Sequence, residues 1–139
     1  MAATLDFELV SPEKLLVSEA VEMVVIPGAE GDIGVLPGHA PLITALRLGV
    51  ICIFANKVVV RRIFVAGGFA EVTAQRCTVL AEEAVPFEML SVDAATRDVS
   101  LRRDEKNAAT DGVERRIAKH RLVVAKAKLD AIAHPPYAG

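Results

Sequence analysis

The turn-rich sequence GAEGDIGVLPGHAP occupies residues 28–41. Together with Pro27, it places four glycines and three prolines within fifteen residues. Glycine adopts backbone angles that other residues avoid, and proline cannot donate a hydrogen bond to a sheet, so this composition predicts repeated chain reversals. Closely spaced reversals favour short antiparallel strands over helices in this half of the chain.

Alternating apolar residues predict strands on both sides of these turns. Leu5, Phe7 and Leu9 alternate with Asp6 and Glu8, which is typical of a half-buried strand. Further strands are predicted at residues 14–17, 21–25, 42–46, 49–54, 58–65, 69–73 and 76–82. Because no helix-length segment intervenes, we predict a mainly β, antiparallel sandwich of about eight to ten short strands. This sandwich domain is expected to span residues 1–86.

Helical periodicity replaces strand alternation after Pro86. Ser91 is a suitable cap for a first helix over residues 92–109, which has a thin apolar face. Asp111 and Glu114 resemble a capping box ahead of a second helix, from about residue 113 to residue 133. The apolar stripe of this second helix consists of Ala118, Leu122, Ala125, Leu129 and Ile132.

The two predicted helices are joined by a short link, so residues 87–139 are expected to form an antiparallel helical hairpin. Residues 1–86 carry 6 basic and 10 acidic side chains, whereas residues 87–139 carry 10 and 8. This difference in charge also indicates two separate structural units. The second helix carries a basic face, Arg115, Arg116, Lys119 and Arg121, which is either simply solvated or docks on an acidic protein surface.

The sequence predicts no catalytic residue, metal site or cofactor. The nucleophile-elbow, zinc-protease and phosphate-loop motifs are absent. The three histidines, His39, His120 and His134, lie in separate segments without ligand spacing. Cys52 and Cys77 lie in apolar strand-like runs, so we expect buried, reduced thiols. Protein binding is therefore a better expectation than catalysis.

Composition also bears on the partners. The whole chain has a net charge of −2 and only 4% aromatic residues, so we expect no nucleic-acid partner. The longest apolar run, residues 48–55, is far shorter than the ~20 residues that span a bilayer, so we expect no membrane insertion.

One turn motif resembles a known family. Residues 31–42, GDIGVLPGHAPL, are similar to the signature turn of the epsilon subunit of bacterial F-type ATP synthase. Other similar motifs follow in the family's order: LVSPE at 9–13, TAL at 44–46, GVI at 49–51, AGGFAEV at 66–72 and VLA at 79–81. The resemblance covers residues 4–84 nearly continuously, which makes it far more specific than any single motif.

The resemblance implies a sandwich followed by a helical hairpin, and a non-catalytic subunit of the rotary central stalk. It implies that the sandwich binds the gamma subunit and the c ring, which couples proton translocation to ATP synthesis. By position, Asp32 falls in the loop that faces the c ring, and Ser11, His39 and Thr44 fall where the family contacts gamma. The implied location is the cytoplasmic face of the bacterial inner membrane, as a peripheral part of the complex.

The hairpin matches the family less closely. Some relatives bind ATP through an Ile/Leu-Asp-x-x-Arg-Ala motif, but here Asp93 is followed by Arg97, one residue late, and the final alanine is absent. Asp93 and Arg97 are i,i+4 neighbours, which favours an ion pair within the helix over a nucleotide site. In some relatives the hairpin extends toward the alpha and beta subunits and inhibits ATP hydrolysis, which is an alternative role for the basic face.

Two other readings remain open at the level of sequence. One is a nucleotide-sensing regulatory sandwich whose hairpin folds around ATP. The other is an unrelated β-sandwich adaptor protein, which would have no affinity for gamma.

Overall fold

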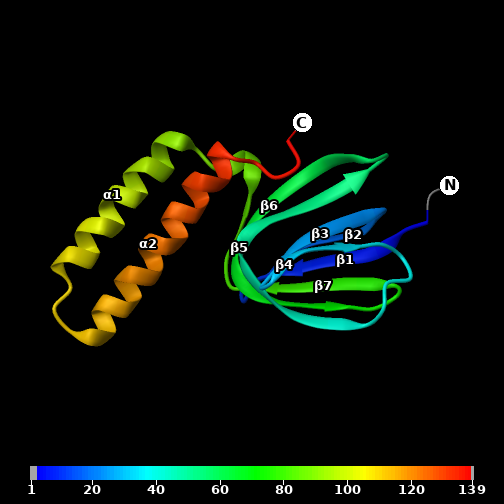
Figure 1. Ribbon diagram of the computed structural model, residues 1–139, viewed down its shortest axis with the longest axis horizontal. Coiled ribbons are helices and arrows are strands. Elements are labelled where there is room, and N and C mark those ends of the chain that lie inside the picture. Colours follow the sequence, from blue (N-terminus) through cyan, green and yellow to red (C-terminus); the bar gives the residue numbers. More distant parts are fainter. Residues whose placement is uncertain (1–2, 139) are drawn as a thin grey trace. The chain divides into compact units, whose positions relative to one another are not determined.

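The computed structural model describes residues 3–138, which form two compact units. The first unit extends to Phe87 and contains eight strands among the described residues, and the second begins at Glu88 and contains two α-helices (Figure 1). The predicted sandwich followed by a helical hairpin is therefore confirmed.

Eight strands build the first unit. They are β1 (Leu5–Val10), β2 (Leu15–Val21), β3 (Met23–Gly28), β4 (Gly31–Val35), β5 (Leu42–Ala55), β6 (Val58–Val72), β7 (Arg76–Ala81) and β8 (Ala84–Pro86). Their order in the sheet is β2-β1-β7-β6-β5-β3-β4, and β8 pairs with β6.

The long strands β5 and β6 pass through both layers of the sandwich. Their distal halves, residues 42–46 and 68–72, pair with each other, and β7, β1 and β2 extend this first layer. The halves at residues 48–55 and 58–66 pair with each other in the second layer, beside β3, β4 and β8. β6 crosses between the layers at Gly67 and Gly68, whose φ angles of 84° and 123° favour glycine.

The sheet differs from the sequence prediction in several ways. Residues 28–41 are predicted as chain reversals, but the turns at 29–30 and 37–38 leave a five-residue strand, β4, between them, and the three-residue strand β8 is not predicted either. The strands expected at 42–46 and 49–54 are one strand, as are those at 58–65 and 69–73, because a bend at glycine does not end a ladder. In addition, β1 and β7 pair in parallel, while the other neighbouring strands pair antiparallel. Apolar and polar residues alternate in the same way in parallel and antiparallel strands, so the sequence pattern does not distinguish the two kinds of pairing.

Aliphatic side chains from both layers fill the interior. Leu5, Phe7 and Leu9 of β1 are at most 2% exposed, as the alternation predicts. Across the core lie Val24, Ile26, Ile51, Ile53, Ile63 and Val65 from the second layer. Burying a side chain such as Phe7 contributes about 1.5–3 kcal/mol, so many such residues stabilise a unit with few aromatics.

Both cysteines are buried free thiols, as expected. Burial raises the pKa of Cys77 to about 12 and, with Arg62 partly opposing it, the pKa of Cys52 to about 11. Neither thiolate is populated near neutral pH, so both residues act as small core side chains.

The second unit is a pair of capped helices, α1 (Val92–Ala108) and α2 (Gly112–Ala133), after a short 3₁₀ helix at Phe87–Met89. The amide of Ala94 donates to Ser91 Oγ (3.2 Å), and the amide of Glu114 donates to Asp111 Oδ1 (2.7 Å), so both predicted caps form. Val99, Leu122, Ala125 and Leu129 pack together between the helices. This cluster is small because Leu101 of α1 is 53% exposed.

Candidate functional site

The outer face of the first layer carries exposed apolar side chains. Ile43 of β5, Phe69 of β6 and Leu80 of β7 are 71%, 59% and 56% exposed. Phe69 pairs with Leu80 across the β6–β7 ladder, and Ile43 pairs with Glu71 across the β5–β6 ladder. Single exposed apolar residues are ordinary, but neighbouring ones on adjacent strands are typical of a protein-binding surface.

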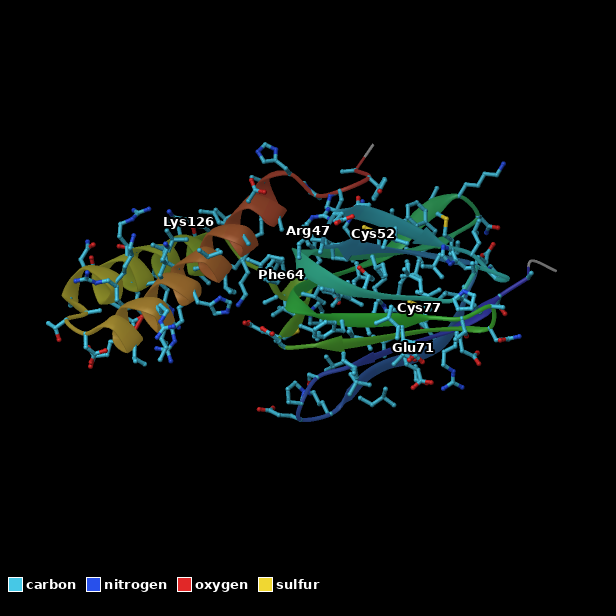
Figure 2. All side chains as sticks on the ribbon, turned by 60° about the horizontal axis from the view of Figure 1, so that its bottom comes forward. Arg47, Cys52, Phe64, Glu71, Cys77 and Lys126 are labelled. Atoms are coloured by element: carbon cyan, nitrogen blue, oxygen red, sulfur yellow. The ribbon has the colours of Figure 1, made fainter. Side chains whose placement is uncertain are left out.

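Two shallow hollows flank the Phe69–Leu80 pair. One hollow of about 440 Å³ is lined by Val10, Ser11, Pro12, Gly68, Phe69, Leu80, Ala81 and Glu82. The other, of about 300 Å³, is lined by Ile43, Phe69, Ala70, Glu71, Thr78 and Leu80. Figure 2 labels Glu71 on the sandwich. Both hollows combine an apolar floor with one carboxylate, which suits a partner that presents apolar and basic side chains.

Ser11 lies at the border of this surface, whereas Thr44 lies beneath it. Ser11 lines the larger hollow, and its amide donates to the carbonyl of Lys14 (2.9 Å). Thr44 follows exposed Ile43 but shares its face of the strand with Leu42 and buried Leu46. The half-buried Thr44 hydroxyl donates to the Ala45 carbonyl (3.0 Å). Of the neighbouring residues Ile43 and Thr44, the one whose side chain points outward is therefore Ile43.

His39 lies at the other end of the first layer from Ser11. Its turn is held beside the β6–β7 link, because the amide of Gly38 donates to the carbonyl of Ala74 (2.7 Å). Its Nδ1 lies 2.7 Å from the Ala40 carbonyl oxygen, which can only accept, so Nδ1 donates. Ser11, His39 and Thr44 are thus spread along the layer and do not form one cluster.

Asp32 lies in the hairpin of β3 and β4, where Arg47 holds it. Arg47 Nη2 donates to Asp32 Oδ1 (2.5 Å), and Arg47 Nη1 donates to the Gly28 carbonyl (2.7 Å). The turn is also tight, since a Cβ at Gly28 would lie 2.7 Å from the Gly31 carbonyl oxygen. The loop is therefore fixed to β5, and its carboxylate is partly neutralised.

The predicted basic face of α2 is exposed to solvent. Arg115, Arg116 and Lys119 are exposed, and Arg121 lies 3.8 Å from Glu105 of α1. Glu105 also accepts from Arg102 (2.8 Å), and Arg102 donates to Asp98 (3.1 Å). The hydrogen bond to Glu105 and the charge of Asp98 raise the pKa of Arg102, although burial opposes this shift.

The nucleotide candidates Asp93 and Arg97 both lie on α1. Both are exposed on α1, and among the described residues they do not form the predicted ion pair with each other. An exposed pair of this kind gains little free energy, so Arg97 remains solvated. A hollow of about 460 Å³ at the helix tips contains Glu105, Glu114 and Arg121, and two carboxylates repel phosphate.

Residues 3–138 contain no group of three or more His, Cys, Asp or Glu side chains that could hold a metal ion. Within that part of the chain, no helix has the length and apolar character needed to cross a membrane.

Sequence reasoning missed Ile43, Phe69, Leu80 and Arg47. The alternation of apolar and polar residues could have shown that the side chains of Ile43, Phe69 and Leu80 point outward, because each of them is next to a core residue of its strand. The contact of Arg47 with Asp32 joins residues 15 positions apart and has no local signal.

Comparisons with known proteins agree with this architecture. Residues 4–87 match the family model described as the beta-sandwich domain of the ATP synthase delta/epsilon chain. The chain is 56% identical over 138 residues to an ATP synthase epsilon chain of Rhodospirillum centenum, covering 96% of this chain and 94% of the relative. It is 51% identical to that of Rhodospirillum rubrum over 131 residues, covering 94% and 98%.

Solved structures share the fold. A chain of the Euglena gracilis mitochondrial ATP synthase structure superposes with a TM-score of 0.77 at 23% identity, covering 96% of this chain and 84% of that chain. A chain from the central stalk and c ring of the Tetrahymena thermophila mitochondrial ATP synthase gives 0.62 at 14% identity, covering 94% and 97%.

Proposed function

Because the chain belongs to the ATP synthase delta/epsilon family, we propose that it is a non-catalytic rotor subunit of the central stalk, which binds the gamma subunit and the c ring. The match along 96% of the chain to an epsilon chain is the observation that carries this proposal. In this role the subunit couples proton translocation to ATP synthesis through rigid contacts, while the chemistry takes place on other subunits.

Gamma is proposed to bind the outer face of the first layer. The exposed side chains of Ile43, Phe69 and Leu80 support this assignment, as does Ser11 at the border of the same surface. An interface with an apolar centre and a polar rim is the usual arrangement for a stable complex. In this proposal His39 lies at the periphery of the gamma-binding surface, at one end of the layer. Thr44 supports that surface from beneath.

The c ring is proposed to contact the β3–β4 loop that carries Asp32. The bonds from Arg47 to Asp32 and to Gly28 support this, because a loop that transmits torque must keep its shape. The free energy of one exposed charge pair is only about 0–1 kcal/mol, so shape contributes more here than charge.

The hairpin is proposed as a regulatory element that meets acidic surfaces of the alpha and beta subunits through Arg115, Arg116, Lys119 and Arg121. The small cluster around Val99 and Leu122 supports the idea that the helices can rearrange. The proposed location of the assembled subunit is peripheral, on the cytoplasmic face of the bacterial inner membrane.

Size-exclusion chromatography of the purified chain with the gamma subunit of the same organism tests the assignment. A co-eluting complex with one copy of each is the expected result. If both proteins are folded and elute separately, the stalk assignment is wrong and an unrelated adaptor becomes the better interpretation.

A further inference from the structure

One line of side chains on the outer face of the first layer is apolar from edge to edge. The strand registers pair neighbouring members in the order Leu15, Val10, Leu80, Phe69 and Ala45. We call these five residues the apolar row. Neighbouring strands are about 4.8 Å apart, so a row across five strands is roughly 19 Å long. Leu15, Leu80 and Phe69 are each more than half exposed.

Carboxylates border the apolar row on both sides. The next line of residues in register is Ser18, Glu8, Thr78, Glu71 and Ile43. Glu8 is paired with Arg76 (2.6 Å), but Glu71 has no ion-pair partner among the described residues. On the opposite side, Glu82 lines the hollow beside Leu80 and likewise has no ion-pair partner in residues 3–138. The row therefore has an unneutralised carboxylate on each border.

The geometry restricts the kind of structure that can cover the row. The row crosses the face of strands that are hydrogen-bonded on both sides for most of its length, so a partner cannot bind there by adding a strand. An α-helix advances 5.4 Å per turn, close to the strand spacing, so one apolar side chain per turn can meet each strand. A row of roughly 19 Å corresponds to about 13 helical residues.

We propose that the apolar row binds one amphipathic helix of the gamma subunit, laid across the strands, and that Glu71 and Glu82 pair with basic side chains on the two borders of that helix. The hollows on either side of Phe69 and Leu80 accommodate the side chains that flank the apolar stripe of the helix. This inference rests on the proposed function, because it names how the same surface recognises gamma.

The charge part is tested by the affinity for purified gamma, measured by calorimetry at low and high salt. Glu71→Arg/Glu82→Arg is expected to weaken binding about tenfold or more at low salt, because like charges then face each other. Glu71→Gln/Glu82→Gln is expected to reduce the salt dependence of the affinity. The control Asp104→Arg/Asp130→Arg makes the same charge change at two exposed positions of α1 and α2, in the second unit, and should bind like the unaltered chain.

The geometric part is tested at the two ends of the row. Leu15→Ser on β2 and Ala45→Arg on β5 are each expected to weaken binding about tenfold, because the helix reaches both edges. The controls Val58→Ser and Val60→Ser remove equally exposed apolar side chains from the other half of β6 and should leave affinity unchanged. Thermal unfolding of each variant shows that a loss of affinity does not arise from unfolding.

The outcomes separate this inference from the proposed function. If the unaltered chain does not bind gamma, the proposed function fails and this inference fails with it. If the unaltered chain binds and Glu71→Arg/Glu82→Arg binds equally well, the charge pairing is overturned while the stalk role stands. If Phe69→Ala weakens binding but changes at Leu15 and Ala45 do not, the contact is compact and the helix across the row is overturned.

Discussion

Single side chains fix the shape of the proposed contact surfaces. Arg47 joins the backbone at Gly28 to the carboxylate of Asp32, and so holds a loop whose own sequence is rich in glycine. Phe69 and Leu80 stand outward because their neighbours Ala70, Val79 and Ala81 occupy the core side of the same strands. Arg47, Phe69 and Leu80 therefore contribute to the proposed contact surfaces through where their side chains lie, not through catalysis.

A double-mutant cycle with Arg47→Ala and Asp32→Ala tests the role of Arg47. Both side chains are about 40% exposed, so their coupling should be only about 0.2–1 kcal/mol and should fall at high salt. Arg47→Ala also removes the bond to Gly28, worth about 0.5–1.5 kcal/mol, so it should remain destabilising in the Asp32→Ala background. Urea unfolding measures each free energy; no cost of Arg47→Ala in that background would contradict this account.

At the scale of elements, the course of β6 depends on its glycines. Gly68 has a φ of 123°, and a Cβ there would lie 2.0 Å from the carbonyl oxygen of Leu80 in β7. The adjoining Gly67 also has a positive φ, so the bend that carries β6 from one layer to the other is confined to two residues. Beyond the bend, residues 69–72 alternate between exposed and buried side chains, whereas residues 63–66 of the other half are all buried.

Gly68→Ala should therefore destabilise the sandwich by at least about 2 kcal/mol, since backbone strain and a backbone clash add together. The matched control is Gly34→Ala in β4, where the added Cβ has no atom within 4 Å apart from Gly34 itself and its two chain neighbours. That variant should stay within about 1 kcal/mol of the unaltered chain. Both free energies come from denaturant unfolding, and a Gly68→Ala variant as stable as Gly34→Ala would refute the explanation of the bend.

At the scale of the whole molecule, the described residues of the main sandwich core cluster all belong to the first unit. A chain that ends after Phe87 should therefore fold and still bind gamma. In the assembled complex, a hairpin that occupies an inhibitory position about half of the time would halve ATP hydrolysis, so the truncation should roughly double the rate.

A hydrolysis assay of complexes with full-length and truncated chains measures this effect. Arg115→Gln/Arg116→Gln/Lys119→Gln is the companion variant, since it keeps the hairpin and removes most of the basic face. It should raise the rate in the same direction. Unchanged hydrolysis after truncation would mean that the hairpin is not inhibitory.

Interactions between residues close together in the chain determined many of the structural elements, and these could be predicted from the sequence alone. Alternation in residues 5–9 gave a strand with a buried face, Ser91 and Asp111 gave the helix starts, and the motifs around residues 31–42 gave the family. These features depend on neighbours in the chain, because side-chain direction and capping are set within a few residues. The two helices and most of the strands could therefore be predicted, whereas β4 and β8 were missed.

Only the tertiary structure decided which distant residues meet. The parallel pairing of β1 with β7, the bond from Arg47 to Asp32 and the apolar row across five strands all join segments far apart in the chain. The alternation of apolar and polar residues along a strand is the same whichever strand lies next to it. The sequence pattern therefore does not determine the register of the strands or their order in the sheet. They are set by the requirement that both layers bury their apolar faces together, which is a property of the folded unit as a whole.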